Sequence, residues 1–154
     1  MIKVGLIGYG VWGKKLYKRL VEISDIRFFC TSKDNFQKKL DEVDWVIIAT
    51  PNSSHYSIVK ECIIAKKDVF CEKPLTPSFE KSKELFQLAE KNGVKLYVDD
   101  IQNFRNSPFK IDKNNIVRRE KKTNYGTKQA LYNLTYHDIY SLHKYISFDS
   151  PNLF

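Results

Sequence analysis

The chain has 154 residues and a formal net charge of +8 at pH 7, with 42% hydrophobic and 14% aromatic residues. This length fits one domain, or one domain with a small appendage, and the apolar content suffices for a packed core, which excludes a disordered chain. No apolar run approaches the ~20 residues that span a bilayer, and the first residues lack the pattern of a secretory signal. We therefore expect a cytoplasmic protein with no membrane partner.

The first hundred residues alternate short apolar runs with helical patterns, which predicts βαβ units around a parallel sheet. Strands are expected at residues 3–7, 26–31, 45–49, 68–71 and 95–98. The first helix is expected over residues 12–22, with Leu16, Leu20 and Ile23 on one face. Only a short helix fits within residues 33–42.

Cap residues mark two further helices. Ser53 or Ser54 is expected to cap a helix that runs to about residue 66, with four inward apolar residues, Ile58, Val59, Cys62 and Ile63. Ser78 is expected to cap a helix of roughly fourteen residues that ends at Asn92-Gly93.

Three glycines form a G-x-G-x-x-G pattern where the first expected strand meets the first expected helix. In a βαβ unit the first glycine makes the tight turn, the second lets the backbone approach a pyrophosphate, and the third permits close contact of helix and strand. The free N–H groups of the helix N-terminus then face the phosphates. The pattern predicts an α/β fold, a Rossmann-type doubly wound parallel sheet, that binds NAD or NADP through Gly8, Tyr9, Gly10, Val11, Trp12 and Gly13.

The second expected strand ends in Cys30-Thr31-Ser32-Lys33, where Rossmann domains distinguish NAD from NADP. An acidic residue there would accept a hydrogen bond from the ribose 2′-hydroxyl of NAD. Two hydroxyls and a cation suit a 2′-phosphate instead, so we expect Thr31, Ser32 and Lys33 to bind the cofactor, with NADP slightly preferred over NAD. Asp34 lies slightly beyond the position of that acidic residue, and it would be the ligand of the ribose if the turn is displaced.

The three cysteines, Cys30, Cys62 and Cys71, show no metal-ligand spacing. Cys30 and Cys71 lie in apolar strand-like runs, where a free thiol behaves as a small hydrophobic residue. We interpret them as core cysteines, with a catalytic thiol as the minor alternative, and we expect no metal.

Glu72-Lys73-Pro74 follows the fourth expected strand. Ligands of open α/β sheets bind beyond the carboxyl ends of the strands. The ammonium of Lys73 would there contact a substrate hydroxyl and favour a developing alkoxide. Taken alone, a lysine at this position is more often a surface charge.

Three motifs together resemble the glucose-fructose oxidoreductase and inositol dehydrogenase (Gfo/Idh/MocA-type) family: Gly8-x-Gly10-x-x-Gly13, Ala49-Thr50-Pro51-Asn52-x-x-His55 and Glu72-Lys73-Pro74. The resemblance continues through Asn103-x-Arg105-x-x-Pro108, which is similar to the family's element after its fifth strand. It implies an NAD(P)-dependent oxidoreductase that transfers a hydride between the nicotinamide and a secondary alcohol or ketone of a sugar, cyclitol or nucleotide-linked sugar.

The resemblance also implies roles for individual residues. Lys73 would touch both cofactor and substrate, with Glu72 as its partner, and His137 would be the acid–base group that takes the hydroxyl proton. Histidine suits that role because its unperturbed pKa is about 6.5. The remaining implied cofactor-binding residues are Thr50, Pro51, Asn52, His55 and, on the nicotinamide side, Asn103.

The sequence departs from the family in three ways. Asn133 replaces the aspartate that precedes the histidine, and the segment between the second and third strands is short. Third, the chain is too short for the family's second domain, which is a large open sheet. We therefore interpret residues 1–102 as the NAD(P)-binding domain and residues 103–154 as a truncated α+β remnant of the substrate and dimerisation domain. A minimal enzyme, a site completed by a partner chain in a homo-oligomer, and a non-catalytic NAD(P)-binding or interaction module all fit.

Residues 105–128 contain eight basic side chains and only two acidic ones, Asp112 and Glu120. A positive patch raises the local concentration of anions, whereas the alternative is a solvated lysine-rich surface. A functional patch would suit an anionic sugar-type substrate. Nucleic acid is the lesser alternative, because no zinc-finger, RNA-recognition or helix-turn-helix signature supports it.

Overall fold

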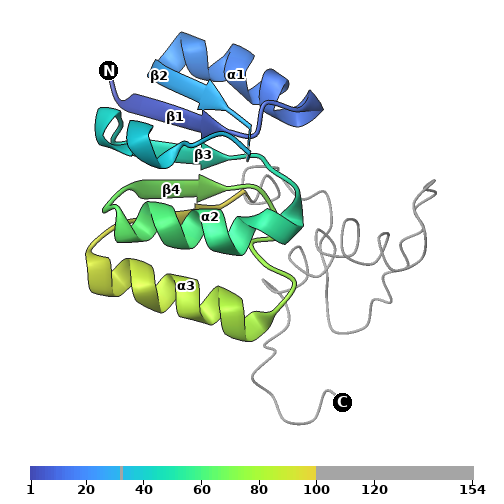
Figure 1. The fold of residues 1–154 in the computed structure, drawn as a ribbon, viewed down its shortest axis with the longest axis vertical. Helices are drawn as coiled ribbons and strands as arrows, with labels where there is room; N and C mark the ends of the chain where they lie inside the picture. The colour runs from blue at the N-terminus through green and yellow to red at the C-terminus, as the bar shows by residue number, and fades with distance from the viewer. Residues whose placement is uncertain (32, 100–154) are drawn as a thin grey trace, which may run out of the picture. The chain divides into compact units, whose positions relative to one another are not determined.

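The computed structural model describes residues 1–31 and 33–99, which form a five-stranded parallel sheet with helices on both faces (Figure 1). By its internal contacts the chain divides into two units, Met1–Asp99 and Asp100–Phe154. Three predicted site residues, Ser32, Asn103 and His137, lie outside the described residues, as do the basic segment 105–128 and the expected second domain.

Strands and helices alternate along the chain as the sequence predicts. The elements are β1 (Lys3–Ile7), α1 (Val11–Ile23), β2 (Asp25–Cys30), the 3-10 helix η1 (Gln37–Glu42), β3 (Trp45–Ile48), α2 (Asn52–Ile64), β4 (Asp68–Cys71), α3 (Phe79–Asn92) and β5 (Leu96–Val98). The spatial order of the strands is β2-β1-β3-β4-β5. The order reverses between β1 and β3, and open α/β sheets bind ligands at such a reversal, beyond the carboxyl ends of the strands.

The register of the sheet aligns the carboxyl ends of its strands. Ile7 of β1 pairs with Cys30 of β2 and with Ile48 of β3, and Ile48 pairs with Cys71 of β4. Cys71 in turn pairs with Val98 of β5. The loops that follow these strands therefore leave the sheet along one edge, which places the glycine pattern beside two of the predicted site loops.

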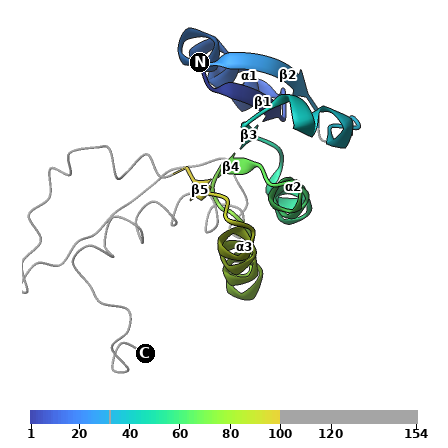
Figure 2. The ribbon, with the colours of Figure 1, turned by 90° about the vertical axis from the view of Figure 1, so that its left-hand side faces the viewer.

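Each face of the sheet has its own core, because neighbouring residues of a strand point to opposite faces. On one face α1 covers Val4, Leu6 and Ile47. On the other, α2, α3 and η1 cover a larger core, and Figure 2 shows α2 and α3 on the same side of the strands. The buried strand residues of this second face are Ile7, Phe28, Cys30, Val46, Ile48, Val69 and Cys71.

All three cysteines are buried and free, as expected for core residues. Burial raises the pKa of the Cys30 thiol to about 11 and that of Cys62 to about 12, and it raises the pKa of Cys71 as well. A thiol in this state is a poor nucleophile.

The observed ends of α3 match the predicted caps. The Ser78 hydroxyl accepts a hydrogen bond from the Lys81 N–H, and Gly93 ends the helix with a left-handed φ of 68°. Two other expectations are wrong. Ile23 is 73% exposed at the end of α1, and α2 begins one residue before Ser53, with Pro51 as its N-cap.

The link between β2 and β3 is as short as expected, and η1 is its only regular element among the described residues. Three apolar side chains anchor it to the core on the α2 face: Phe36, Leu40 and Val43. None of the helices in residues 1–31 and 33–99 is long and apolar enough to cross a membrane.

Candidate functional site

Two of the three glycines in the turn between β1 and α1 are required by close backbone contacts. Gly8 has a φ of +107°, and a Cβ there would lie 2.5 Å from the carbonyl carbon and oxygen of Ala49. A Cβ on Gly13 would lie 1.7 Å from the Gly8 carbonyl oxygen. Any side chain at either position would therefore push α1 or β3 away from the turn.

Gly10 differs from these two, because a Cβ there would meet nothing within 4 Å. Gly10 is the N-cap of α1, and no side chain caps the helix. The following residue, Val11, is 82% exposed. The helix N-terminus therefore presents its first N–H groups and the positive end of its dipole to open space, an arrangement that fits a phosphate group.

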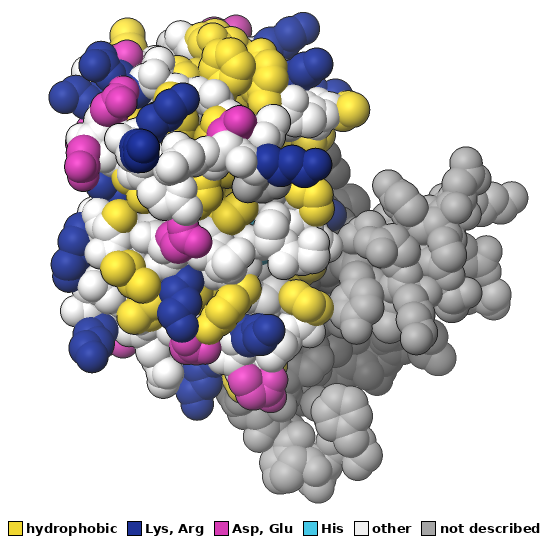
Figure 3. Space-filling view, viewed as in Figure 1, with side chains coloured by type: hydrophobic (Ala, Val, Ile, Leu, Met, Phe, Trp, Pro, Cys, Tyr) yellow, Lys and Arg dark blue, Asp and Glu magenta, His cyan; other side chains and the backbone are white. Residues whose placement is uncertain are grey.

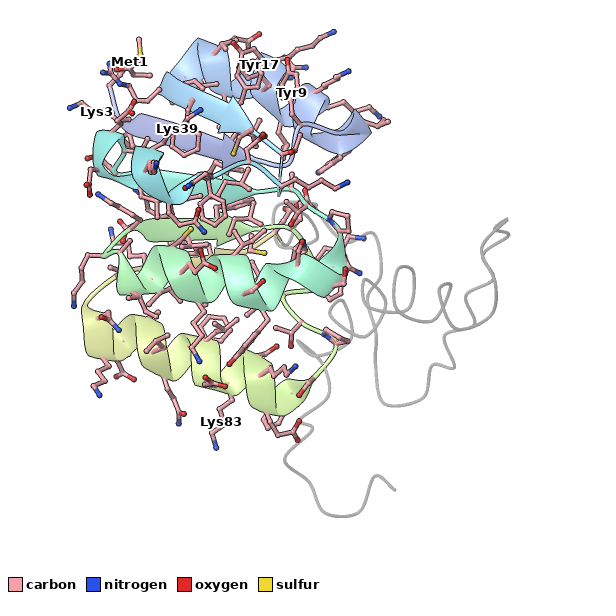
Figure 4. The ribbon with its side chains drawn as sticks, in the orientation of Figure 1. Met1, Lys3, Tyr9, Tyr17, Lys39 and Lys83 are labelled. Atoms are coloured by element: carbon pink, nitrogen blue, oxygen red, sulfur yellow. The ribbon has the colours of Figure 1, made fainter. Side chains whose placement is uncertain are left out.

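Tyr9, between the first two glycines, packs its ring against other aromatic side chains. Its centroid lies 4.3 Å from that of Phe29 on β2 and 5.5 Å from that of Tyr17 on α1. Figure 4 shows Tyr9 and Tyr17 close together at this end of the sheet, and the space-filling view shows hydrophobic side chains gathered over α1 and β2 (Figure 3). The ring of Tyr9 thus orders the turn by packing against β2 and α1.

The turn after β2 holds a carboxylate at the end of the strand. Asp34 Oδ2 accepts hydrogen bonds from the backbone N–H of Thr31 at 2.6 Å and from its hydroxyl at 2.9 Å. These bonds lower the pKa of Asp34 because they stabilise the ionised carboxylate. Both the backbone N–H and the hydroxyl of Thr31 are thereby hydrogen-bonded to Asp34, while Lys33 is exposed.

The loop after β3 carries Thr50, Pro51 and Asn52 into the first turn of α2. Thr50 is buried, and its hydroxyl accepts a hydrogen bond from the Ser54 hydroxyl at 2.9 Å. The His55 side chain is fully buried, and its two ring nitrogens lie 2.8 Å from the Thr50 carbonyl oxygen and 2.9 Å from the Pro74 carbonyl oxygen. His55 therefore joins the loop after β3 to the loop after β4.

Glu72 follows β4, and its nearly buried carboxylate accepts a hydrogen bond from the indole N–H of Trp12 in the glycine turn. Burial raises the pKa of Glu72 to about 7; the Trp12 hydrogen bond and the charge of Lys73 oppose this shift, and repulsion and hydrogen bonding with Asp99 add to it. A carboxyl with a pKa near neutral can hold or release a proton under physiological conditions.

Lys73 is half-buried in the same loop, next to the cis peptide bond that joins it to Pro74. The structure thus brings together most of the predicted residues at the carboxyl edge: the glycine turn, the Thr50 loop, His55, Glu72 and Lys73. No group of three or more His, Cys, Asp or Glu side chains within residues 1–31 and 33–99 is arranged to hold a metal ion.

The sequence analysis missed two features of the site. Asp99 directly follows β5 at the edge where Glu72 follows β4, so the parallel sheet pattern was a signal that could have found it. The hydrogen bond between Trp12 and Glu72 had no sequence signal, because the two residues are 60 positions apart.

Comparison with known proteins agrees with this geometry. The family model of the Gfo/Idh/MocA group, described as an oxidoreductase family with an NAD-binding Rossmann fold, matches residues 17–100, which is more than half of the chain. Scyllo-inositol 2-dehydrogenase (NADP(+)) IolW of Bacillus subtilis (strain 168) is 30% identical over 151 residues. That match covers 86% of this chain and 42% of the relative, so the chain spans about two-fifths of the relative's length.

Two solved structures have the same fold. UDP-N-acetylglucosamine 3-dehydrogenase GnnA from Acidithiobacillus ferrooxidans superposes with a TM-score of 0.59 at 23% identity, over 63% of this chain and 38% of that one. Biliverdin reductase from Synechocystis sp. PCC 6803, in complex with biliverdin and NADP+, superposes with a TM-score of 0.58 at 26% identity, over 67% and 39%.

Proposed function

Since the chain belongs to the Gfo/Idh/MocA oxidoreductase family, with its NAD-binding Rossmann fold, we propose that it acts as an NAD(P)-dependent oxidoreductase on CH–OH groups. The reaction is hydride transfer between the nicotinamide and a secondary alcohol or ketone. The proposed substrate is a sugar, a cyclitol or a nucleotide-linked sugar. The name of the Bacillus subtilis relative, an inositol dehydrogenase, supports the cyclitol class.

The observation that carries this proposal is the contact between the glycine turn and the loop that holds Lys73. Trp12 at the start of α1 donates to Glu72, the residue directly before Lys73. A dinucleotide whose pyrophosphate lies on the N-terminus of α1 would therefore extend along the edge toward Lys73. The ammonium of Lys73 would bind the substrate oxygen and stabilise negative charge on it.

Different residues would bind different parts of the cofactor. Gly10 and the N-terminus of α1 would bind the pyrophosphate, and Thr50, Pro51 and Asn52 would border the ribose and nicotinamide. When bound, the cofactor supplies the hydride acceptor or donor. Glu72, whose pKa is raised to about 7, would hold a proton beside Lys73, and we propose His137 as the group that takes the proton from the substrate hydroxyl.

The preference between NAD and NADP depends on the turn after β2. Thr31, Ser32 and Lys33 favour NADP, and the Bacillus subtilis relative is named for NADP(+). We propose that Asp34 shifts the preference toward NAD. Its carboxylate is held at the end of β2 by two hydrogen bonds from Thr31, where it would repel a 2′-phosphate and accept from a ribose hydroxyl.

Calorimetric titration of the full chain with NADH and NADPH in parallel tests cofactor binding. Turnover is then measured by NAD(P)H absorbance with scyllo-inositol and UDP-N-acetylglucosamine as probes. We expect Lys73→Met to abolish turnover while retaining cofactor binding. The matched control is Lys67→Met, a half-buried lysine that precedes β4 at the opposite edge of the sheet.

The outcomes separate the alternatives. Binding without turnover with any sugar or cyclitol probe would support a non-catalytic NAD(P)-binding module. Binding of neither nucleotide would overturn the proposal. Equal loss of turnover in Lys73→Met and Lys67→Met would remove Lys73 from the proposed site.

A further inference from the structure

The ring of His55 faces two hydrogen-bond acceptors. Nε2 lies 2.8 Å from the carbonyl oxygen of Thr50, and Nδ1 lies 2.9 Å from that of Pro74. A carbonyl oxygen can only accept, so a hydrogen bond at either contact requires an N–H on the ring, which an imidazole supplies from one of its two nitrogens.

We propose that His55 is a positioning residue that bridges the loop after β3 and the loop after β4 through its two ring nitrogens and so fixes the separation of these loops, an inference that rests on the proposed function. Pro74 directly follows Lys73, and the backbone of Ala49 and Thr50 lies against Gly8. His55 therefore determines where Lys73 stands relative to the glycine turn. Because the side chain is 0% exposed, it does this from behind the site, without touching the cofactor.

The two carbonyl groups explain why a histidine suits this position. Both lie beyond the ends of their strands, so the sheet ladder cannot supply their donors. An apolar side chain at position 55 would leave both buried acceptors without a hydrogen bond from it, which is unfavourable. The histidine ring places one nitrogen against each carbonyl group and so links Pro74, 19 positions further along the chain than His55, to the loop after β3.

Nitrogen-15 NMR of the unmodified chain, labelled at histidine, tests the ring contacts directly. The chain has three histidines, and the signals lost in His55→Gln identify those of His55. We expect a ring N–H of His55 to exchange slowly with solvent, because the ring is buried and donates to a loop carbonyl. A His55 ring without a slowly exchanging N–H would overturn the proposal.

Cofactor affinity then tests the positioning role against a purely structural one. His55→Leu removes both ring nitrogens, and Ile63→Ala is the matched control, because Ile63 is equally buried in α2 but lies in its last turn. At a temperature where circular dichroism shows both variants folded, we expect a loss of at least roughly tenfold in NADH or NADPH affinity for His55→Leu only. His55→Gln, which keeps N–H donors, should recover part of the loss.

Equal affinities for the His55→Leu and Ile63→Ala variants would overturn the positioning role. If His55→Leu does not fold, the comparison of His55→Gln with the control decides in the same way. A failure of the unmodified chain to bind either nucleotide would instead refute the proposed function, and the nitrogen-15 spectrum would still decide whether the His55 ring donates to the loop carbonyls.

Discussion

The indole Nε1 of Trp12 donates a hydrogen bond to the carboxylate of Glu72, although the two residues are 60 positions apart. Trp12 is half-exposed in the first turn of α1, and Glu72 is nearly buried after β4. The contact passes the carboxyl end of β3, because β3 lies between β1 and β4 in the sheet. It joins the proposed phosphate-binding turn to the loop that carries Lys73.

Trp12→Phe removes this hydrogen bond and should raise the pKa of Glu72 further above about 7, because the indole N–H stabilises the ionised carboxylate. Carbon-13 NMR titration of glutamate side chains measures the shift. Trp45→Phe is the control, since the Trp45 ring stacks on that of Tyr97, with the centroids 5.9 Å apart, at the start of β3, whereas Glu72 follows the end of β4. A Glu72 pKa that is unchanged in Trp12→Phe would contradict the observed contact.

Glu72 should make the protein less stable as pH rises. Folding raises its pKa from 4.5 to about 7, so the folded state binds more protons, and its stabilising contribution is lost as pH rises through that window. We expect the free energy of unfolding to fall by about 2 kcal/mol more in the wild type than in Glu72→Gln between about pH 5 and pH 8; this value allows for solvent screening. Urea denaturation at both pH values measures the difference, and parallel pH dependence in the two proteins would refute it.

Gly10→Ala and Gly13→Ala should have opposite consequences. At Gly10 the added methyl group meets nothing within 4 Å, so we expect stability to change by less than about 1 kcal/mol while cofactor affinity falls. At Gly13 the methyl group would lie 1.7 Å from the Gly8 carbonyl oxygen, and we expect a loss of more than about 3 kcal/mol. Thermal denaturation and calorimetry measure both effects; a stable Gly13→Ala variant would show that α1 can shift.

Asp34→Asn should favour NADP, because it removes a negative charge at the end of β2 while keeping an acceptor for Thr31. We expect the affinity ratio of NADPH to NADH to rise roughly three- to tenfold, a modest effect because salt screens an exposed charge. Lys33→Met is the opposing control and should lower the same ratio. If Asp34→Asn leaves the affinity ratio of NADPH to NADH unchanged, the Asp34 carboxylate does not contact the ribose of the cofactor.

The local pattern predicted the order of elements because hydrophobic periodicity and caps act over a few residues. The left-handed conformation of Gly93 follows from its lack of a side chain, and the cap at Ser78 follows from its hydroxyl group. Ile23 was expected on one face of the first helix with Leu16 and Leu20, but α1 ends at Ile23 and its side chain is exposed. The start of α2 was misplaced because Pro51, which fits the residue before a helix, provides the N-cap in place of a serine.

The sequence by itself determined the parallel sheet, the glycine turn and the carboxyl-edge position of Lys73, because each depends on the order of strands and on the backbone needs of glycine. Only the tertiary structure decided that Trp12 meets Glu72, that Asp34 turns back to Thr31, and that His55 lies between two carbonyls. These contacts depend on the register and spacing of loops from separate strands. Neighbouring residues in the sequence carry no information about such distances, which packing sets when the sheet closes against its helices.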